Sequence, residues 1–151
     1  MVLAAKDEVP TALFANTTGI NNTSVGTSSL AANTTGGYNV SVGYLSLDAN
    51  TSGGSNTALG YNTLGANTTA DNNTAVGTQA LKLNTTGTNN TAVGRSALSA
   101  NTTGNSHTAV GSGALSSTTT ATNNTGIGYN ALNDCTTGYE IQLVVMKLVV
   151  L

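Results

Sequence analysis

The sequence has little charge, few aromatic side chains, and almost no proline, histidine or cysteine. Of its 151 residues, 7% are charged and 4% are aromatic, and tryptophan is absent. Four Lys or Arg against six Asp or Glu give no basic stripe, so we expect no nucleic-acid partner. A single cysteine excludes both an internal disulfide framework and a cysteine-based zinc site. Stability must therefore come from the backbone and from uncharged side chains.

Residues that carry out catalysis are equally scarce. One histidine and six acidic residues provide no recurring carboxylate pair and no nucleophile with a base beside it. The glycines match no phosphate-binding loop, because the required Gly-Lys-Ser/Thr ending never occurs. Calcium-binding β-rolls need regularly spaced aspartates, whereas Asp48 and Asp71 fall in different columns of the repeat described below. We expect a protein that is not an enzyme and uses neither a metal nor a cofactor.

Targeting signals are also missing from the start of this chain. Residues 1–10 carry neither a basic leader nor an apolar run of signal-peptide length. We expect no membrane span either.

What the sequence does contain is a strict repeat of 17 residues. It is set by seven glycines, at Gly26, Gly43, Gly60, Gly77, Gly94, Gly111 and Gly128. A period kept without insertion or deletion indicates equivalent stacked turns, as in a solenoid, where a slipped register would misalign every later coil.

Two aliphatic columns keep the same period. The first is the leucine column, Leu30, Leu47, Leu64, Leu81, Leu98, Leu115 and Leu132. The second, the valine column, directly precedes the glycine at Val25, Val42, Leu59, Val76, Val93, Val110 and Ile127. We predict both as buried rows of a thin core that runs along the stack. A column of small residues, Ala58, Ala75, Ala92 and Ala109, offers a face that could pack closely against another chain.

The spacing within one unit excludes helices and predicts strands. Apolar residues do not recur at helical intervals, and the glycines would break a helix about every eight residues. We predict two short strands per turn, for example at 74–76 and 80–83, with a corner at Asn84–Gly87 whose glycine has positive φ. The predicted fold is all-β: a parallel β-solenoid, or β-roll, of 17-residue turns stacked about 4.8 Å apart. Residues 1–15 are predicted as a cap or lead-in, 16–140 as the solenoid, and 141–151 as an atypical apolar strand.

Asparagines form two further columns. One contains Asn22, Asn39, Asn56, Asn73, Asn90, His107 and Asn124, where the histidine is interpreted as a tolerated substitution. The other opens each corner, and we predict that it forms a hydrogen-bonded ladder at Asn33, Asn50, Asn67, Asn84 and Asn101. Together with Asn16, these five are also candidate glycosylation sites, since each begins an Asn-x-Ser/Thr acceptor, as do Asn72, Asn89 and Asn123.

Units such as NNTAVGTQALKLNTTGTNNTAVGRSALSANTTG, at Asn72–Gly104, resemble repeats of phage tail-fibre and bacterial surface-fibre proteins. Those repeats often precede a self-cleaving intramolecular chaperone domain. More distantly, NNTAVG is similar to the N-S-V-A-I-G signature of trimeric autotransporter adhesin heads, which are β-rolls packed as trimers. The resemblance implies an elongated, homotrimeric fibre, outside the cell or on a virion.

The last eleven residues, IQLVVMKLVVL, interrupt the repeat and allow three interpretations. They form a last, atypical turn that caps the stack, or an assembly strand that pairs with another subunit, with Ile141, Leu143, Val145 and Leu148 as its apolar residues. Alternatively, they are a frame-shifted repeat. Restoring one base in a codon series for these residues yields Asn-Thr-Ala-Gly-Gly-Tyr-Glu-Ala, close to the next unit.

These observations predict a structural or adhesive fibre segment that associates with itself, as a trimer or end to end, and that could contact a cell-surface glycan or receptor. The alternative is a carbohydrate-binding, glycan-decorated or ice-binding module. Ice binding needs Thr-x-Thr on one strand face, whereas the recurrent pair here is two adjacent threonines. Because successive side chains of a strand point to opposite faces of the sheet, only one threonine of each pair could join a row on one face. Sugar binding would favour an aromatic row, but the column of Tyr44, Tyr61 and Tyr129 is interrupted.

Overall fold

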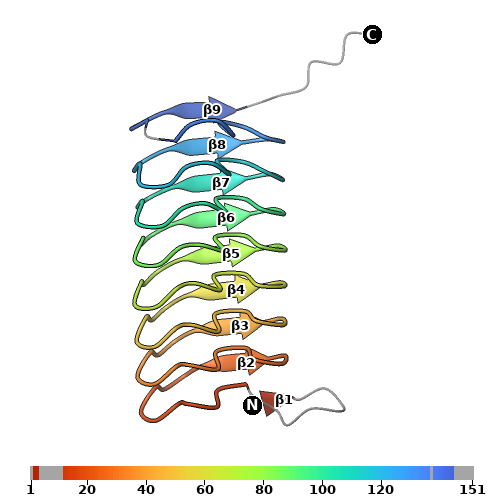
Figure 1. Ribbon diagram of the computed structural model, residues 1–151, viewed down its shortest axis with the longest axis vertical. Coiled ribbons are helices and arrows are strands. Elements are labelled where there is room, and N and C mark those ends of the chain that lie inside the picture. Colours follow the sequence, from red (N-terminus) through yellow and green to blue (C-terminus); the bar gives the residue numbers. More distant parts are fainter. Residues whose placement is uncertain (1, 4–11, 137, 145–151) are drawn as a thin grey trace.

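The computed structural model describes residues 2–3, 12–136 and 138–144, and shows a single column of stacked turns (Figure 1). Nine parallel strands form one sheet in the order β1 to β9. They are Val2–Leu3 (β1), Thr23–Val25 (β2), Val40–Val42 (β3), Thr57–Leu59 (β4), Thr74–Val76 (β5), Thr91–Val93 (β6), Thr108–Val110 (β7), Thr125–Ile127 (β8) and Gln142–Val144 (β9). The predicted all-β parallel solenoid is confirmed.

The register between coils equals the sequence period. Thr74 pairs with Thr91, and Val76 with Val93, so paired residues are 17 apart. The same offset holds from β2 through β9. Only β1 departs from it, because Val2 pairs with Ser24. Equivalent side chains therefore lie directly above one another along the stack.

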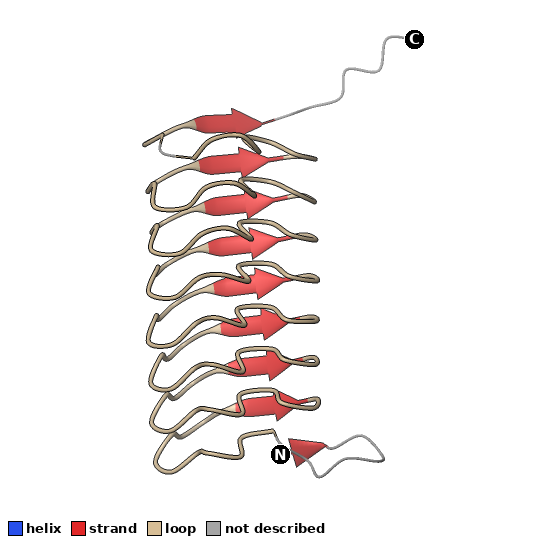
Figure 2. Cartoon of the chain, viewed as in Figure 1, coloured by secondary structure: helices blue, strands red, loops and turns tan. Residues whose placement is uncertain are grey.

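Each complete coil contains one strand, not the two predicted. The segment expected as a second strand, at 80–83, is a turn, and Figure 2 shows loop on that side of every coil. The reason lies in the backbone of the leucine column: Leu81 has φ 49° and Leu98 has φ 51°, in the left-handed region. A left-handed residue cannot belong to an extended strand.

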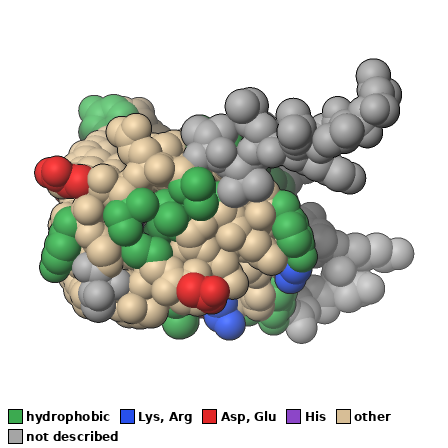
Figure 3. Space-filling model, turned by 90° about the horizontal axis from the view of Figure 1, so that it is seen from above, with side chains coloured by type: hydrophobic (Ala, Val, Ile, Leu, Met, Phe, Trp, Pro, Cys, Tyr) green, Lys and Arg blue, Asp and Glu red, His purple; other side chains and the backbone are tan. Residues whose placement is uncertain are grey.

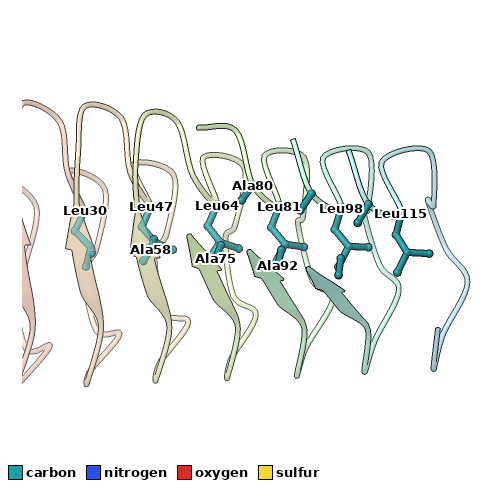
Figure 4. Packing of buried hydrophobic residues seen from close by; sticks show 13 residues of the cluster. Leu30, Leu47, Ala58, Leu64, Ala75, Ala80, Leu81, Ala92, Leu98 and Leu115 are labelled. Atoms are coloured by element: carbon teal, nitrogen blue, oxygen red, sulfur yellow. The ribbon is translucent and has the colours of Figure 1, made fainter. Parts of the chain in front are cut away.

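The leucines adopt this conformation because it turns their side chains into the interior. Left-handed φ costs an ordinary residue about 1–2 kcal/mol, whereas full burial of a leucine contributes about 1.5–3 kcal/mol. All six from Leu30 to Leu115 are 0% exposed, and Leu132 packs against them. The core is this leucine row facing a row of small residues from the sheet, as Figure 4 shows for Leu81 and Ala92.

The prediction that the valine column lines the core is wrong. In β2 to β8 only the middle residue is buried, and Ala75 and Ala92, for example, are 0% exposed. Their neighbours point outward, so Val93 is 36% exposed. Because a leucine from the opposite side already fills the coil, the strand has room for only a small residue inside. Every residue of the valine column is partly exposed or exposed: Val25, Val42, Leu59, Val76, Val93, Val110 and Ile127.

The same correction applies to the small-residue column. Ala58, Ala75, Ala92 and Ala109 do not offer a face to another chain, because all four are completely buried inside the coil. In the first coils serine takes their place and forms a buried hydroxyl network. The hydroxyl of Ser24 donates to Ser29, and that of Ser29 donates to Ser41, each at 2.8 Å. The core therefore changes from hydroxyl-bonded to apolar along the stack.

The two glycine columns have different causes. Gly94 has φ 133°, and a methyl group on it would lie 2.5 Å from the carbonyl oxygen of Gly111, so both conformation and space require glycine. The corner glycines, in contrast, do not have the positive φ that we predicted. At Gly87 the constraint is crowding, since a methyl would clash with the carbonyl oxygen of Gly104 and lie 2.5 Å from Oδ1 of Asn84. Alanine nevertheless occurs in this column at Ala70 and Ala121, so the crowding favours glycine without excluding alanine.

The stack extends past both expected limits of the solenoid. Before residue 16, the backbone N–H groups of Leu13 and Ala15 already donate to Ser29 and Ala31 of the next coil. After residue 140, β9 continues the sheet in register, with Leu143 opposite Gly126. The described part of the apolar tail is thus a further turn of the same stack. Val145 and Leu148 of the predicted assembly strand lie outside the described residues.

Candidate functional site

The corner asparagines form a continuous ladder through the stack. Nδ2 of each donates to Oδ1 of the asparagine one coil earlier at 2.8–3.0 Å, from Asn33 to Asn16 and onward to Asn101. The second hydrogen of Nδ2 closes the corner, as in the 2.9 Å bond from Asn84 to the carbonyl of Gly87. The ladder ends where Thr118 replaces asparagine, and Oδ1 of Asn101 is left without a partner among the described residues.

The second asparagine column makes a different ladder. Its Oδ1 accepts the backbone N–H of the equivalent residue one coil later, as in the 3.0 Å bond from Asn90 N to Asn73. Its Nδ2 donates to a corner carbonyl, here Gly104 at 2.9 Å from Asn90. Each amide therefore bonds to the coil that follows it. This column fixes the vertical register of the stack from inside.

His107 takes an asparagine position in that ladder and reproduces both bonds. Its Nδ1 accepts the N–H of Asn124 at 3.2 Å, and Nε2 lies 2.7 Å from the carbonyl oxygen of Ala121. These partners require hydrogen on Nε2 and none on Nδ1, which is the neutral imidazole. Burial lowers the pKa of His107 below its ordinary value. The side chain is a structural substitute for asparagine, without the access that a catalytic base needs.

The ladder excludes most of the candidate glycosylation sites in the folded protein. Asn33, Asn50, Asn67, Asn84 and Asn101 are 0% exposed, and both hydrogens of each Nδ2 are donated. A glycan would replace one of these hydrogens and has no space. Asn16, at the start of the ladder, is only partly buried. Of the other acceptors, Asn72, Asn89 and Asn123 are exposed.

The Thr-Thr pairs of the corners do not alternate between faces. They belong to a turn, so both side chains lie outside: Thr85 is partly exposed and Thr86 is exposed. The Thr85 hydroxyl donates to the carbonyl of Thr102 at 2.9 Å, and equivalent bonds recur along the stack. The expectation that strand alternation places the two threonines of each pair on opposite faces is therefore wrong.

The outer face of the sheet is a regular surface, and we call it the sheet face. It consists of the outward side chains of β2 to β8, which form a mainly threonine row and the valine column. None of these side chains is charged. Four aliphatic members are more than one-third exposed, namely Val40, Val42, Val93 and Ile127 at 37%, 36%, 36% and 37%. Sequence reasoning missed this face, although the alternation in Thr-Ala-Val could have revealed it.

Other features of the surface are local. The rings of Tyr44 and Tyr61 stack with centroids 5.9 Å apart, but Thr78 and Arg95 interrupt their column. At the C-terminal end of the stack, Leu143 is 41% exposed, and Figure 3, which looks onto that end, shows hydrophobic side chains there and few charged ones.

Clusters of potential metal ligands and membrane-spanning helices are both absent from the described residues. No group of three or more His, Cys, Asp or Glu side chains is placed to hold a metal ion. Within the same part of the chain, no helix is long and apolar enough to cross a membrane.

Comparisons with protein-family models, with curated proteins and with solved structures found no match for this chain.

Removing one rung of the corner ladder tests its contribution to stability. Asn84→Ala leaves Oδ1 of Asn67 and a hydrogen of Asn101 without partners, and removes one of the two hydrogen bonds to the carbonyl of Gly87. Each unsatisfied buried group costs about 1–3 kcal/mol, so we expect the free energy of unfolding in urea to fall by at least about 2 kcal/mol. Thr86→Ala, an exposed change in the same corner, should stay within about 0.5 kcal/mol. Equal effects of the two substitutions would contradict the ladder.

The pH dependence of stability tests the role of His107. Because its pKa is lower in the folded protein, the unfolded chain binds more protons below the ordinary value of about 6.5. The contribution of neutral His107 to the free energy of unfolding is therefore fully present above that pH. It falls as the pH decreases below it, by no more than about 1.4 kcal/mol per pH unit. His107→Asn restores the residue that the other coils carry at this position. We expect its free energy of unfolding, relative to that of the parent chain, to increase from pH 7.5 to pH 5. A constant difference would show that the imidazole is not held neutral.

Proposed function

We propose that this chain is a structural fibre segment whose coils associate with those of identical chains through the sheet face. The observation that carries the proposal is the uncharged, partly exposed aliphatic column that runs without a break from Val25 to Ile127. Contiguous exposed apolar surface of this kind usually marks a site of association. On this proposal the protein acts through its shape and its repetition.

The spacing of the sheet face favours a second copy of the same chain as its partner. Its rows repeat at every coil, about 4.8 Å apart. Ridges with that spacing interdigitate along their whole length only with a surface of equal spacing, and another copy of this chain has one. The absence of charge also supports self-association, because identical faces carrying like charges would repel each other.

Three chains is the number that we propose, following the resemblance to trimeric β-roll repeats. A homotrimer with its sheet faces at the centre would bury the valine column and leave the Thr-Thr corners outside. The exposed apolar side chain of Leu143 at the end of the stack supports a second contact, end to end, that would lengthen the fibre. By the same resemblance, we place the fibre outside the cell or on a virion.

A charge on the sheet face should separate the chains. Val93→Lys leaves the interior unchanged, because this side chain points outward, but it brings several lysines together in any assembly through the face. In light scattering after size exclusion, we expect the parent chain at three times its 14.9 kDa and the variant at one, with unchanged circular dichroism. Leu83→Lys, also exposed but outside the sheet, should stay trimeric.

A monomeric parent chain, or a Val93→Lys variant that remains trimeric, would exclude the sheet face as the interface. The first result would favour the second candidate function, ice binding. The observation for it is the uninterrupted threonine row from Thr57 to Thr125 on one strand face, although an aliphatic residue stands where the second threonine of a Thr-x-Thr pair would be. A monomer with this face open to water should then show thermal hysteresis, which Val93→Lys abolishes.

A further inference from the structure

A hollow of about 400 Å³ lies on the corner that precedes the strands, in the first half of the stack. Its floor is formed by Gly37 and Gly54, and Ile20 and Asp71 occupy the same column on either side along the stack. Tyr38 and Asn72 stand at its rim beside the hydroxyls of Thr35, Ser52 and Ser55. Sites for small molecules commonly have such volumes. The hollow exists because two successive coils lack the side chain that other coils carry in this column.

The missing side chain leaves a backbone donor unused. At two positions of this column the N–H of one coil is accepted by the side chain of the next: Gly54 N donates to Oδ1 of Asp71 at 2.6 Å, and Thr88 N to Oδ1 of Asn105 at 2.7 Å. For Gly37 the next coil supplies Gly54, which has no acceptor. A methyl on Gly54 would lie 3.0 Å from the carbonyl oxygen and 3.8 Å from the nitrogen of Gly37, so a side chain at position 54 would reach this peptide backbone. The N–H of Gly37 has no partner among the described residues.

The rim offers complementary groups. Asp71 uses Oδ1 for Gly54, and its exposed carboxylate has a second oxygen free to accept a hydrogen bond from a ligand. The ring of Tyr38 is 62% exposed beside it and provides an apolar face. One donor, one strong acceptor, several hydroxyls and an aromatic face are thus gathered in one small hollow.

We propose that this hollow binds a neutral saccharide. A sugar ring presents a face of C–H groups to Tyr38, a hydroxyl oxygen accepts the N–H of Gly37, and another hydroxyl donates to Asp71. Hydroxyls can play both parts at once, which a carboxylate or phosphate cannot. The negative charge of Asp71 also opposes an anionic ligand.

Sugar binding at this hollow goes beyond self-association and is independent of it. No residue of any strand lines the hollow, so a trimer built on the sheet face would leave it open. Three copies on one fibre would then bind a glycan-covered surface with higher avidity than one site alone.

The proposal is tested with the full chain by saturation-transfer NMR and calorimetry. The probes are glucose, galactose, mannose, N-acetylglucosamine and N-acetylgalactosamine, with N-acetylneuraminic acid as the anionic comparison. We expect saturable binding of at least one neutral sugar. Gly54→Asp places in the hollow the residue that the next coil already carries, and gives Gly37 N the acceptor that it lacks. We expect Gly54→Asp to weaken sugar binding at least tenfold without lowering the melting temperature.

Two further variants separate the site from a general effect. Tyr38→Ser removes the apolar face, using a residue that occurs in the same column at Ser55 and Ser106, and should also weaken binding at least tenfold. Tyr129→Ser, which removes an exposed tyrosine elsewhere, should leave binding unchanged. The proposal is overturned if no neutral sugar binds, if the anionic sugar binds most tightly, or if Gly54→Asp binds as the parent does.

Discussion

The fold depends on the equal length of its coils. Because every coil has 17 residues, the backbone donors of one coil meet the acceptors of the next, and each side chain meets its own equivalent. The buried amides convert this geometry into stability: the corner ladder bonds asparagine to asparagine, and the inner ladder bonds asparagine to backbone. A single residue more or less would break both ladders at once. In a chain with so little apolar volume, these bonds define the register that a large core would otherwise select.

The same constraint explains the unusual backbone. A coil this short must turn sharply, and it does so at glycines such as Gly94 and at left-handed leucines such as Leu98. The interior then holds one leucine facing one small residue, so the larger aliphatic side chains of the strands are placed outside. That arrangement leaves an apolar column on the surface, and it links the architecture directly to the proposed association of identical chains. Where two coils lack a corner side chain, at Gly37 and Gly54, the surface becomes hollow instead.

Periodicity alone was sufficient to predict the all-β solenoid, because residues that repeat strictly every 17 positions indicate equivalent positions in successive stacked coils. It was insufficient to say which aliphatic column is inside. That distinction depends on which three residues are extended, and Val76 and Leu81 look equivalent until Leu81 is known to be left-handed. Propensity argues against a left-handed leucine, and burial overrides propensity here. The hollow was likewise hidden, although Gly37 and Gly54 already departed from their column.

The claim that coil length governs this structure is tested most directly by thermal unfolding of two insertions. One duplicates a complete unit, residues 72–88, and the other adds one alanine between Ala75 and Val76. The duplication preserves every rung, so the melting temperature should equal or exceed that of the parent chain. The single alanine reverses the inward and outward sides of a strand and shifts the ladders, so it should lower the melting temperature by several degrees. If both insertions were tolerated equally, or if the duplication destabilised the chain, register would not be what holds the stack together.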